Sequence, residues 1–337
     1  MLTQLTLSNI RNVSKMTLEP SSGVNLIVGA SGAGKSTMLE AMHLLSTGAS
    51  HRGRRYASIV RSGERELTVS GVVSSKSIMR RIGVSRDSQS KWKLSIDREP
   101  QSRLAALAGM FPLRVISADS WRVVVGEPEL RRNLIDWFLF HVEQEQYPLF
   151  QYRRLLQQRN AALQQEASNR VIDAIDQNLI PTAEEVHRYR TQLVATMNCI
   201  LFDQPTTTMT YKSGFGDSLY HAFEKSRGTD RKLRTTTRGP HRADLLISCY
   251  NRPAKEVLSQ GQIARVATTL QLRLISLMEN VAVCLDDVHA FLDEEALEGL
   301  ISQIGSRQIF VTETRESSSF LKDHAQKLFH VEHGELL

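Results

Sequence analysis

The feature that most constrains the fold is the octapeptide "GASGAGKS" at residues 29–36. It follows the apolar run "NLIV" and precedes "STMLEAMHLL", which has the composition of a helix. Glycine adds no side chain to a core and costs backbone entropy, so this loop is poorly suited to packing. Its backbone N–H groups can instead surround an anion at a helix N-terminus, where the helix dipole favours negative charge. The segment therefore predicts a strand, a phosphate-binding turn and a helix, in that order.

The loop satisfies the pattern G-x-x-x-x-G-K-[ST] in full and in its required strand-to-helix context. In this pattern the loop N–H groups hold the α- and β-phosphates, Lys35 reaches the β- and γ-phosphates, and the Ser36 hydroxyl binds Mg²⁺. The alternative is a strand-turn-helix with chance glycines, which the complete pattern disfavours. We therefore predict an ATP and Mg²⁺ site with the nucleotide-binding residues Gly29, Ala30, Ser31, Gly32, Ala33, Gly34, Lys35, Ser36 and Thr37.

A second acidic element of such a site is predicted at "VAVCLDD", residues 281–287. Its apolar residues predict a buried strand that ends in two carboxylates. Asp286 is the candidate ligand of Mg²⁺, and Asp287 is the candidate group that orients or deprotonates the attacking water. Taken alone, the two aspartates have an equally good explanation as caps of the next helix. Together with the upstream loop, they favour catalysis, with Lys35, Asp286 and Asp287 as the catalytic set.

The segment "LSQGQIARVATTLQLRL" begins a further predicted helix at residues 258–262. A capping role explains Ser259 but not Gly261, because glycine in the first turn lowers helix stability. A helix N-terminus that offers N–H groups and a hydroxyl to a γ-phosphate accounts for both residues. Ser259, Gly261 and Gln262 are thus predicted to form a second phosphate-binding element.

Composition places the chain among ordinary globular proteins. It has 337 residues, of which 41% are hydrophobic and 23% charged, and a formal net charge of +6. The positive charge permits nucleic acid as a partner without proving it. The three cysteines, Cys199, Cys249 and Cys284, are few and widely separated, which is typical of reduced thiols. Neither a signal peptide nor an apolar run long enough for a membrane span is present, so we expect a cytoplasmic protein without membrane contact.

The pattern of predicted secondary structure changes twice along the chain. Short β-rich runs and one helix fill residues 1–125, helical spacing dominates residues 126–234, and β/α alternation returns over residues 235–337. The two β-rich ends each hold half of the predicted nucleotide site. We therefore predict an α/β fold in which an ATPase head is built from residues 1–125 and 235–337. A mainly helical lid subdomain, residues 126–234, is inserted between these parts.

These features together resemble an ATP-binding-cassette ATPase head of the SMC-like type. Lys35 and Asp286 lie too far apart for a transporter cassette and too close for an SMC coiled coil. Finer matches run from Leu5 to about Thr312 and resemble the RecF family of bacterial recombination-repair ATPases. The segments that carry this resemblance are "LTLSNIRN", "GEPELRRNLIDW", "RRLLQQRNAAL", "GPHRADLLI", "LSQGQ" and "LDDVHAFLDEE".

The resemblance implies that ATP joins two copies of the head, each site being completed by Ser259, Gly261 and Gln262 of the partner. It implies that this homodimer binds double-stranded DNA near single-strand gaps, and that weak, DNA-stimulated ATP hydrolysis releases it. It further implies RecR and RecO as partners in loading the strand-exchange protein at gaps. His289 and Phe291 depart from the family pattern, and the resemblance assigns no role to them or to Thr312.

Two other functions compete with this one. The chain could be the nucleotide-binding subunit of a transporter, but such a cassette has a shorter lid and a switch histidine after the strand that holds Thr312. It could also be a scaffold that binds nucleotide without hydrolysing it. The intact set of Lys35, Ser36, Asp286 and Asp287 argues against the scaffold.

Two basic groups are candidates for contact with DNA phosphates. They could neutralise a duplex without reading its sequence, and the alternative is that they are solvated loop residues. The candidates are Arg52, Arg54, Arg55, Arg231, Lys232 and Arg234.

Overall fold

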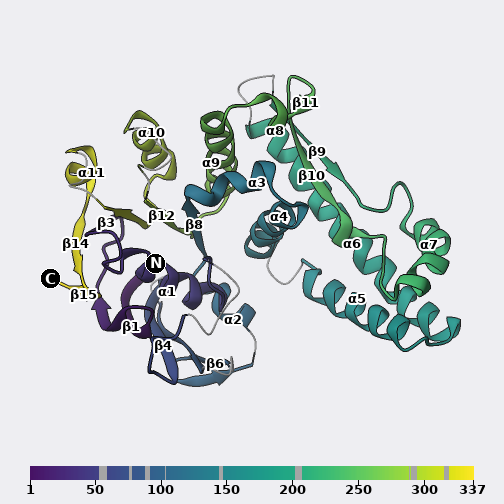
Figure 1. The fold of residues 1–337 in the computed structure, drawn as a ribbon, viewed down its shortest axis with the longest axis horizontal. Helices are drawn as coiled ribbons and strands as arrows, with labels where there is room; N and C mark the ends of the chain where they lie inside the picture. The colour runs from purple at the N-terminus through teal and green to yellow at the C-terminus, as the bar shows by residue number, and fades with distance from the viewer. Residues whose placement is uncertain are drawn as a thin grey trace. The chain divides into compact units, whose positions relative to one another are not determined.

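The computed structural model describes residues 1–52, 59–75, 78–87, 92–102, 104–143, 147–201, 207–287, 289, 294–314 and 319–337. Contacts divide the chain into two compact units (Figure 1). The first contains Met1–Ser120 and Ile275–Leu337, and the second contains Trp121–Leu274. The α/β fold with an inserted, mainly helical part is confirmed. The three-part division stays a prediction, and by contacts the inserted part extends to Leu274 rather than to residue 234.

The described residues of the first unit form two sheets. One has the strand order β15-β14-β3-β13-β12-β8, with parallel pairing from β14 to β8, and the other is antiparallel with the order β2-β1-β4-β5-β6-β7. The strands of the first sheet are β3 (Val24–Val28), β8 (Leu113–Ser117), β12 (Ala282–Asp286), β13 (Ile309–Glu313), β14 (Lys327–Glu332) and β15 (Glu335–Leu336). Those of the second are β1 (Leu2–Ile10), β2 (Val13–Leu18), β4 (Glu66–Ser75), β5 (Ile78–Asp87), β6 (Trp92–Ile96) and β7 (Glu99–Gln101).

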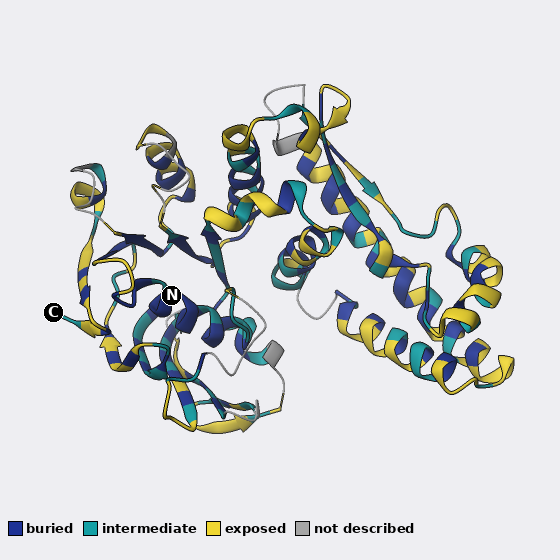
Figure 2. Cartoon of the chain, viewed as in Figure 1, coloured by how far each residue is buried: buried dark blue, intermediate teal, exposed yellow. Residues whose placement is uncertain are grey.

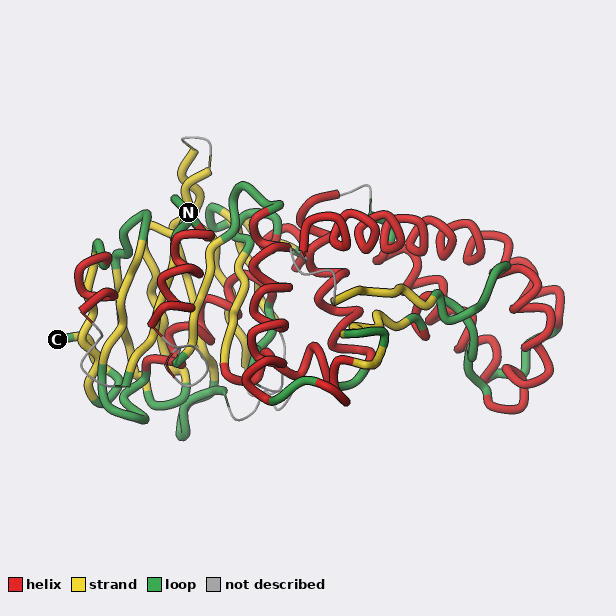
Figure 3. The backbone as a smooth tube through the Cα atoms, turned by 90° about the horizontal axis from the view of Figure 1, so that it is seen from above, coloured by secondary structure: helices red, strands yellow, loops and turns green. Residues whose placement is uncertain are grey.

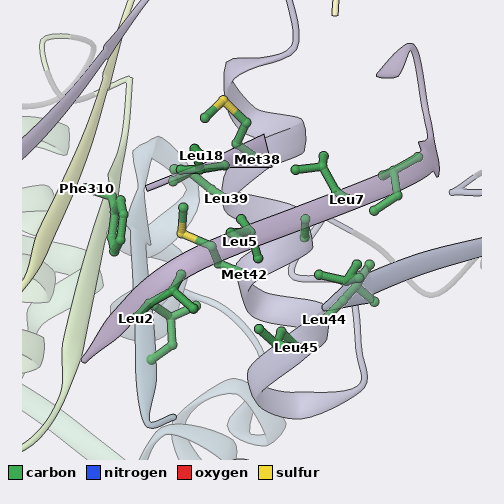
Figure 4. Close-up of a cluster of buried hydrophobic side chains, with 14 of the residues drawn as sticks. Leu2, Leu5, Leu7, Leu18, Met38, Leu39, Met42, Leu44, Leu45 and Phe310 are labelled. Carbon is green, nitrogen blue, oxygen red and sulfur yellow. The ribbon is translucent and has the colours of Figure 1, made fainter. Parts of the chain in front are cut away.

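Helix α1 (Lys35–Thr47) contacts strands of both sheets and carries much of the core of this unit. Its Met38, Leu39 and Met42 are fully buried and join Leu5 of β1 and Phe310 of β13 in one apolar cluster (Figure 4). Strand β3 is buried along its whole length, as expected for an inner strand of a parallel sheet. The remaining helices of the unit are α2 (Leu104–Ala108), α10 (Glu294–Ile304) and α11 (Ser319–His324).

The second unit is mainly helical, with a three-stranded sheet of order β11-β10-β9 (Figure 3). Its long helices are amphipathic, with buried residues along one face and exposed residues along the other (Figure 2). Its helices are α3 (Arg122–Val125), α4 (Pro128–Glu143), α5 (Leu149–Gln164), α6 (Asn169–Leu201), α7 (Leu219–Leu233), α8 (Ala254–Val257) and α9 (Gln260–Ser276). Its strands are β9 (Thr207–Lys212), β10 (Asp244–Cys249) and β11 (Arg252–Pro253).

Long-range pairing explains why residues 235–274 join the helical unit. Strand β10 pairs with β9 in antiparallel register from Asp244 to Cys249. Its first residue, Asp244, also accepts hydrogen bonds from Arg131 of α4, with an Nε–Oδ1 distance of 2.8 Å. The sequence around β10 reads as a strand, but it contains nothing that names its partner strand.

A buried ionic network joins α5, α6 and α7. Arg159 is fully buried and donates to Asp176 and to Asp230, each at 2.7 Å, and to the Thr236 hydroxyl at 3.0 Å. Buried charges are costly unless each one has a close partner. The segment "QRNAAL" therefore has a structural role in holding this unit together.

We expect Arg159→Leu to lower the free energy of unfolding by about 3–5 kcal/mol, because fully buried Asp230 would lose the cation that pairs with it. Asp176 would keep its longer contact with Arg227, at 3.4 Å. Chemical denaturation of the purified protein measures this change. Arg154→Leu, an exposed position on the same helix, is the matched control and should change stability by less than about 0.5 kcal/mol. Equal stability of the two variants would contradict the assignment.

Candidate nucleotide site

The turn between β3 and α1 approaches its neighbours so closely that glycine is required. A Cβ on Gly29 would lie 2.2 Å from the carbonyl oxygen of Val331, which no side chain could tolerate. Gly34 has a φ of 122°, a backbone conformation that other residues rarely adopt. Gly29 and Gly34 are thus needed for the backbone path of the loop.

Lys35 is held at this loop. Its Nζ donates to the carbonyl oxygens of Gly29 and Ala30 at 2.7 and 2.8 Å, and the residue is only 6% exposed. Burial lowers the pKa of Lys35, while the nearby carboxylates of Asp287 and Asp286 act in the opposite direction. The one side-chain cation of the octapeptide therefore lies where the phosphates are expected.

Residues far apart in the sequence meet at the carboxyl ends of the parallel strands. Asp286, the last residue of β12, accepts hydrogen bonds on one oxygen, Oδ1, from Ser36 Oγ at 2.9 Å and from Thr312 Oγ1 at 2.8 Å. The predicted Mg²⁺ ligands Ser36 and Asp286 are thus brought together. A hydroxyl and a carboxylate are suitable oxygen ligands for this ion, which binds one or two such groups beside the phosphates.

Asp287 lies next to this cluster and is exposed. Its φ of 52° lies in the left-handed region, which is uncommon for a residue other than glycine and turns the chain sharply after β12. Its N–H donates to Thr312 Oγ1 at 2.9 Å. The carboxylate of Asp287 is therefore accessible to water, as its predicted role requires.

Three residues to which the sequence alone assigns no role support the site, namely Asn12, Gly334 and Thr312. Asn12 Nδ2 donates to the Gly32 carbonyl at 3.0 Å, and Thr37 Oγ1 donates to Asn12 Oδ1 at 3.3 Å. Gly334 N donates to the Ala33 carbonyl at 2.8 Å. Thr312 is the third, through its bond to Asp286. Only the pairing of distant strands brings Asn12 and Thr312 to the loop and gives them a function.

The segment after α1 is tied to an ion pair between fully buried Glu40 and partly exposed Arg11. Arg11 and Glu40 are joined by two hydrogen bonds of 2.9 Å, and Ser50 Oγ also contacts Glu40. The backbone N–H of Arg52 donates to Ser50 Oγ at 3.0 Å, and Arg52 is exposed. Two of the predicted DNA contacts, Arg54 and Arg55, lie outside the described residues, as does Phe291.

The predicted signature lies at the start of α9, in the second unit. Ser259 N donates to Gln262 Oε1 at 2.9 Å, and Gln262 N donates to Ser259 Oγ at 3.4 Å, which is a reciprocal capping box. Gly261 is exposed, and a Cβ there would meet no atom within 4 Å. Capping thus explains Ser259 and Gln262, but nothing among the described residues of this chain explains a glycine at position 261.

The basic group at the C-terminal end of α7 contacts α6 and the turn before it, and one of these contacts is with an acidic residue. Arg231 donates to Asn169 and to the Ala167 carbonyl, and Arg234 pairs with Glu166 at 2.6 Å. Lys232 is exposed. Whether these residues contact DNA stays a prediction, and the pairing of Arg234 with Glu166 lowers their combined positive charge.

The fold and the site define a P-loop ATPase of the head-domain class. Residues 1–336 match the family described as RecF/RecN/SMC N terminal domain. The "DNA replication and repair protein RecF" of Pseudoalteromonas translucida is 30% identical over 361 residues, covering 100% of this chain and 99% of the relative. That of Pseudoalteromonas atlantica is 32% identical over 357 residues, covering 99% and 98%. The chain belongs to the RecF family.

Solved structures show the same fold. A structure described as "the recombination mediator protein RecF-ATP in RecFOR pathway" has a TM-score of 0.89 at 24% identity, covering 100% of this chain and 96% of that one. An Smc head bound to the C-winged helix domain of ScpA has a TM-score of 0.60 at 13% identity, with coverages of 100% and 97%. Among the described residues, no helix is both long and apolar enough to span a bilayer.

Proposed function

We propose that this protein is an ATP-dependent DNA-binding protein of recombinational gap repair and a weak, DNA-stimulated ATPase. The observation that carries the proposal is the meeting of Ser36 and Thr312 at one carboxylate oxygen at the end of the phosphate loop. Their hydroxyls donate to Oδ1 of Asp286 at 2.9 and 2.8 Å. Relatives of this chain have the name "DNA replication and repair protein RecF".

The residues of the site have separate roles in phosphoryl transfer. When bound, ATP and Mg²⁺ supply the transferable phosphoryl group and the neutralisation of its charge. The loop N–H groups and Lys35 bind the phosphates, and the oxygens of Ser36 and Asp286 hold the metal ion. Asp287 accepts a hydrogen bond or proton from the attacking water, for which its exposed position is suited.

The signature residues complete the site of a second copy. Ser259, Gly261 and Gln262 are exposed at a helix N-terminus, which favours an anion. The open space around Gly261 lets a phosphate approach the backbone closely, which a side chain would prevent. In the proposed cycle ATP therefore drives homodimerisation, and hydrolysis separates the two copies.

The proposed partner of the dimer is double-stranded DNA near single-strand gaps, bound through its phosphates by exposed cations such as Arg52 and Lys232. RecR and RecO are proposed as protein partners, because a RecF structure similar in fold is described as part of the RecFOR pathway. Their joint role would be the loading of strand-exchange protein in the cytoplasm.

The test is ATP turnover by the purified protein with and without gapped duplex DNA. We expect slow hydrolysis that rises with DNA and falls at least about 100-fold in Asp287→Asn, because the amide keeps the shape of the side chain but cannot accept a proton. ATP and DNA binding should survive in this variant. Binding without turnover in the unsubstituted protein would favour the scaffold, and turnover unchanged by DNA would remove the repair role.

A further inference from the structure

A close contact joins the segment after β12 to the end of β13. Nε2 of His289 lies 2.5 Å from Oε1 of Glu313. Glu313 is the last residue of β13 and only 3% exposed, whereas the His289 side chain is 42% exposed. Neither residue belongs to the predicted nucleotide site, and the resemblance to the RecF family gave His289 no role.

Glu313 is anchored to the phosphate loop through its backbone. It pairs with Val28 in the parallel register of β13 and β3, and its carbonyl oxygen accepts a hydrogen bond from Gly29 N at 3.3 Å. The backbone of Glu313 is therefore fixed relative to the first residue of the loop. A carboxylate so deeply buried requires a close polar or cationic partner, and the imidazole of His289 is one.

His289 lies two residues beyond Asp287, whose backbone needs support. The left-handed backbone conformation of Asp287 is unfavourable for an aspartate and persists only where neighbouring contacts hold it. One such contact is the bond from Asp287 N to Thr312 Oγ1, and the pair of His289 with Glu313 is the next one along both segments. Two contacts thus attach Asp287 and His289 to Thr312 and Glu313.

We infer that the His289–Glu313 pair is a positioning pair, which sets the distance between the Asp287 carboxylate and the phosphate loop. The inference rests on the proposed function, because it concerns the hydrolytic step assigned to Asp287. The pair acts through Asp287 and does not itself touch the nucleotide. A displacement of a catalytic carboxylate by about 1 Å can lower the reaction rate about 100-fold.

The test compares His289→Ala with His289→Gln. Alanine removes the contact, and we expect kcat for ATP to fall about 10- to 100-fold while the Kd for ATP changes less than about threefold. Glutamine places an amide nitrogen at a reach similar to that of Nε2 and should recover most of the rate. An unchanged kcat in His289→Ala would overturn the inference.

A second comparison separates positioning from simple stabilisation. The double variant His289→Ala with Glu313→Gln also removes the buried charge that His289 faces, so its thermal stability should return towards that of the unsubstituted protein. Its turnover should stay low, because the attachment of the Asp287 segment is still missing. Recovery of turnover together with stability would overturn the positioning role. Absence of any turnover in the unsubstituted protein would overturn the proposed function, and this inference with it.

Discussion

Ser259→Arg is expected to abolish ATP-dependent dimerisation while each copy still binds ATP. Ser259 is exposed at the N-terminus of α9, where the helix dipole disfavours a cation. The bulky guanidinium would occupy the place proposed for the partner's γ-phosphate. Loss of the cap to Gln262 costs only about 1 kcal/mol, so folding should survive. Sedimentation in the presence of ATP measures the fraction of dimer. ATP hydrolysis and salt-resistant DNA binding should be lost together with dimerisation.

Mixing two defective variants makes this test sharper. A heterodimer of Ser259→Arg and Lys35→Ala protein has one intact composite site, with Lys35 from the first chain and Ser259 from the second, and one doubly damaged site. Some ATP-driven association should therefore return on mixing. Ser259→Thr keeps a hydroxyl cap and is the matched control, expected to dimerise. A Ser259→Arg protein that dimerises like the unsubstituted one would exclude the shared-site mechanism.

Lys35→Ala is expected to weaken ATP binding at least about 100-fold, which corresponds to a loss of about 2.7 kcal/mol. Lys35 is the only side-chain cation of the octapeptide, and its ammonium group already lies at the loop, 2.7 Å from the Gly29 carbonyl. Its removal deletes the charge that opposes the β- and γ-phosphates.

Titration of nucleotide into the purified variant measures this loss. Lys232→Ala removes an exposed lysine of α7 and serves as the control, with ATP affinity expected to stay unchanged. Affinity in Lys35→Ala equal to that of the control would show that the loop is not the nucleotide site.

Local patterns in the sequence were sufficient for the elements that carry the site. The strand, loop and helix from Val24 to Thr47 form as predicted, since the loop pattern depends only on adjacent residues. The buried strand that ends at Asp286 is confirmed for the same reason. The start of α9 was also predictable, because Ser259 and Gln262 cap each other three residues apart.

Contacts between distant segments could not be predicted from the sequence. Nothing adjacent to Thr312 shows that it shares the Asp286 oxygen with Ser36, because that contact arises only when β3, β13 and β12 become neighbours in one parallel sheet. Asn12 acquires its role in the same way, by reaching the loop from the turn after β1.

Strand partnership and charge pairing also depended on the tertiary structure. Strand β10 was recognisable as a strand, but its pairing with β9 puts it in the helical unit. Glu166 lies far from Arg234 in the sequence and yet neutralises it. The sequence by itself thus determined the local elements and the residue types that bind phosphate. Only the tertiary structure decided which distant strands and charges meet, because side-chain periodicity specifies which face is buried but not what covers it.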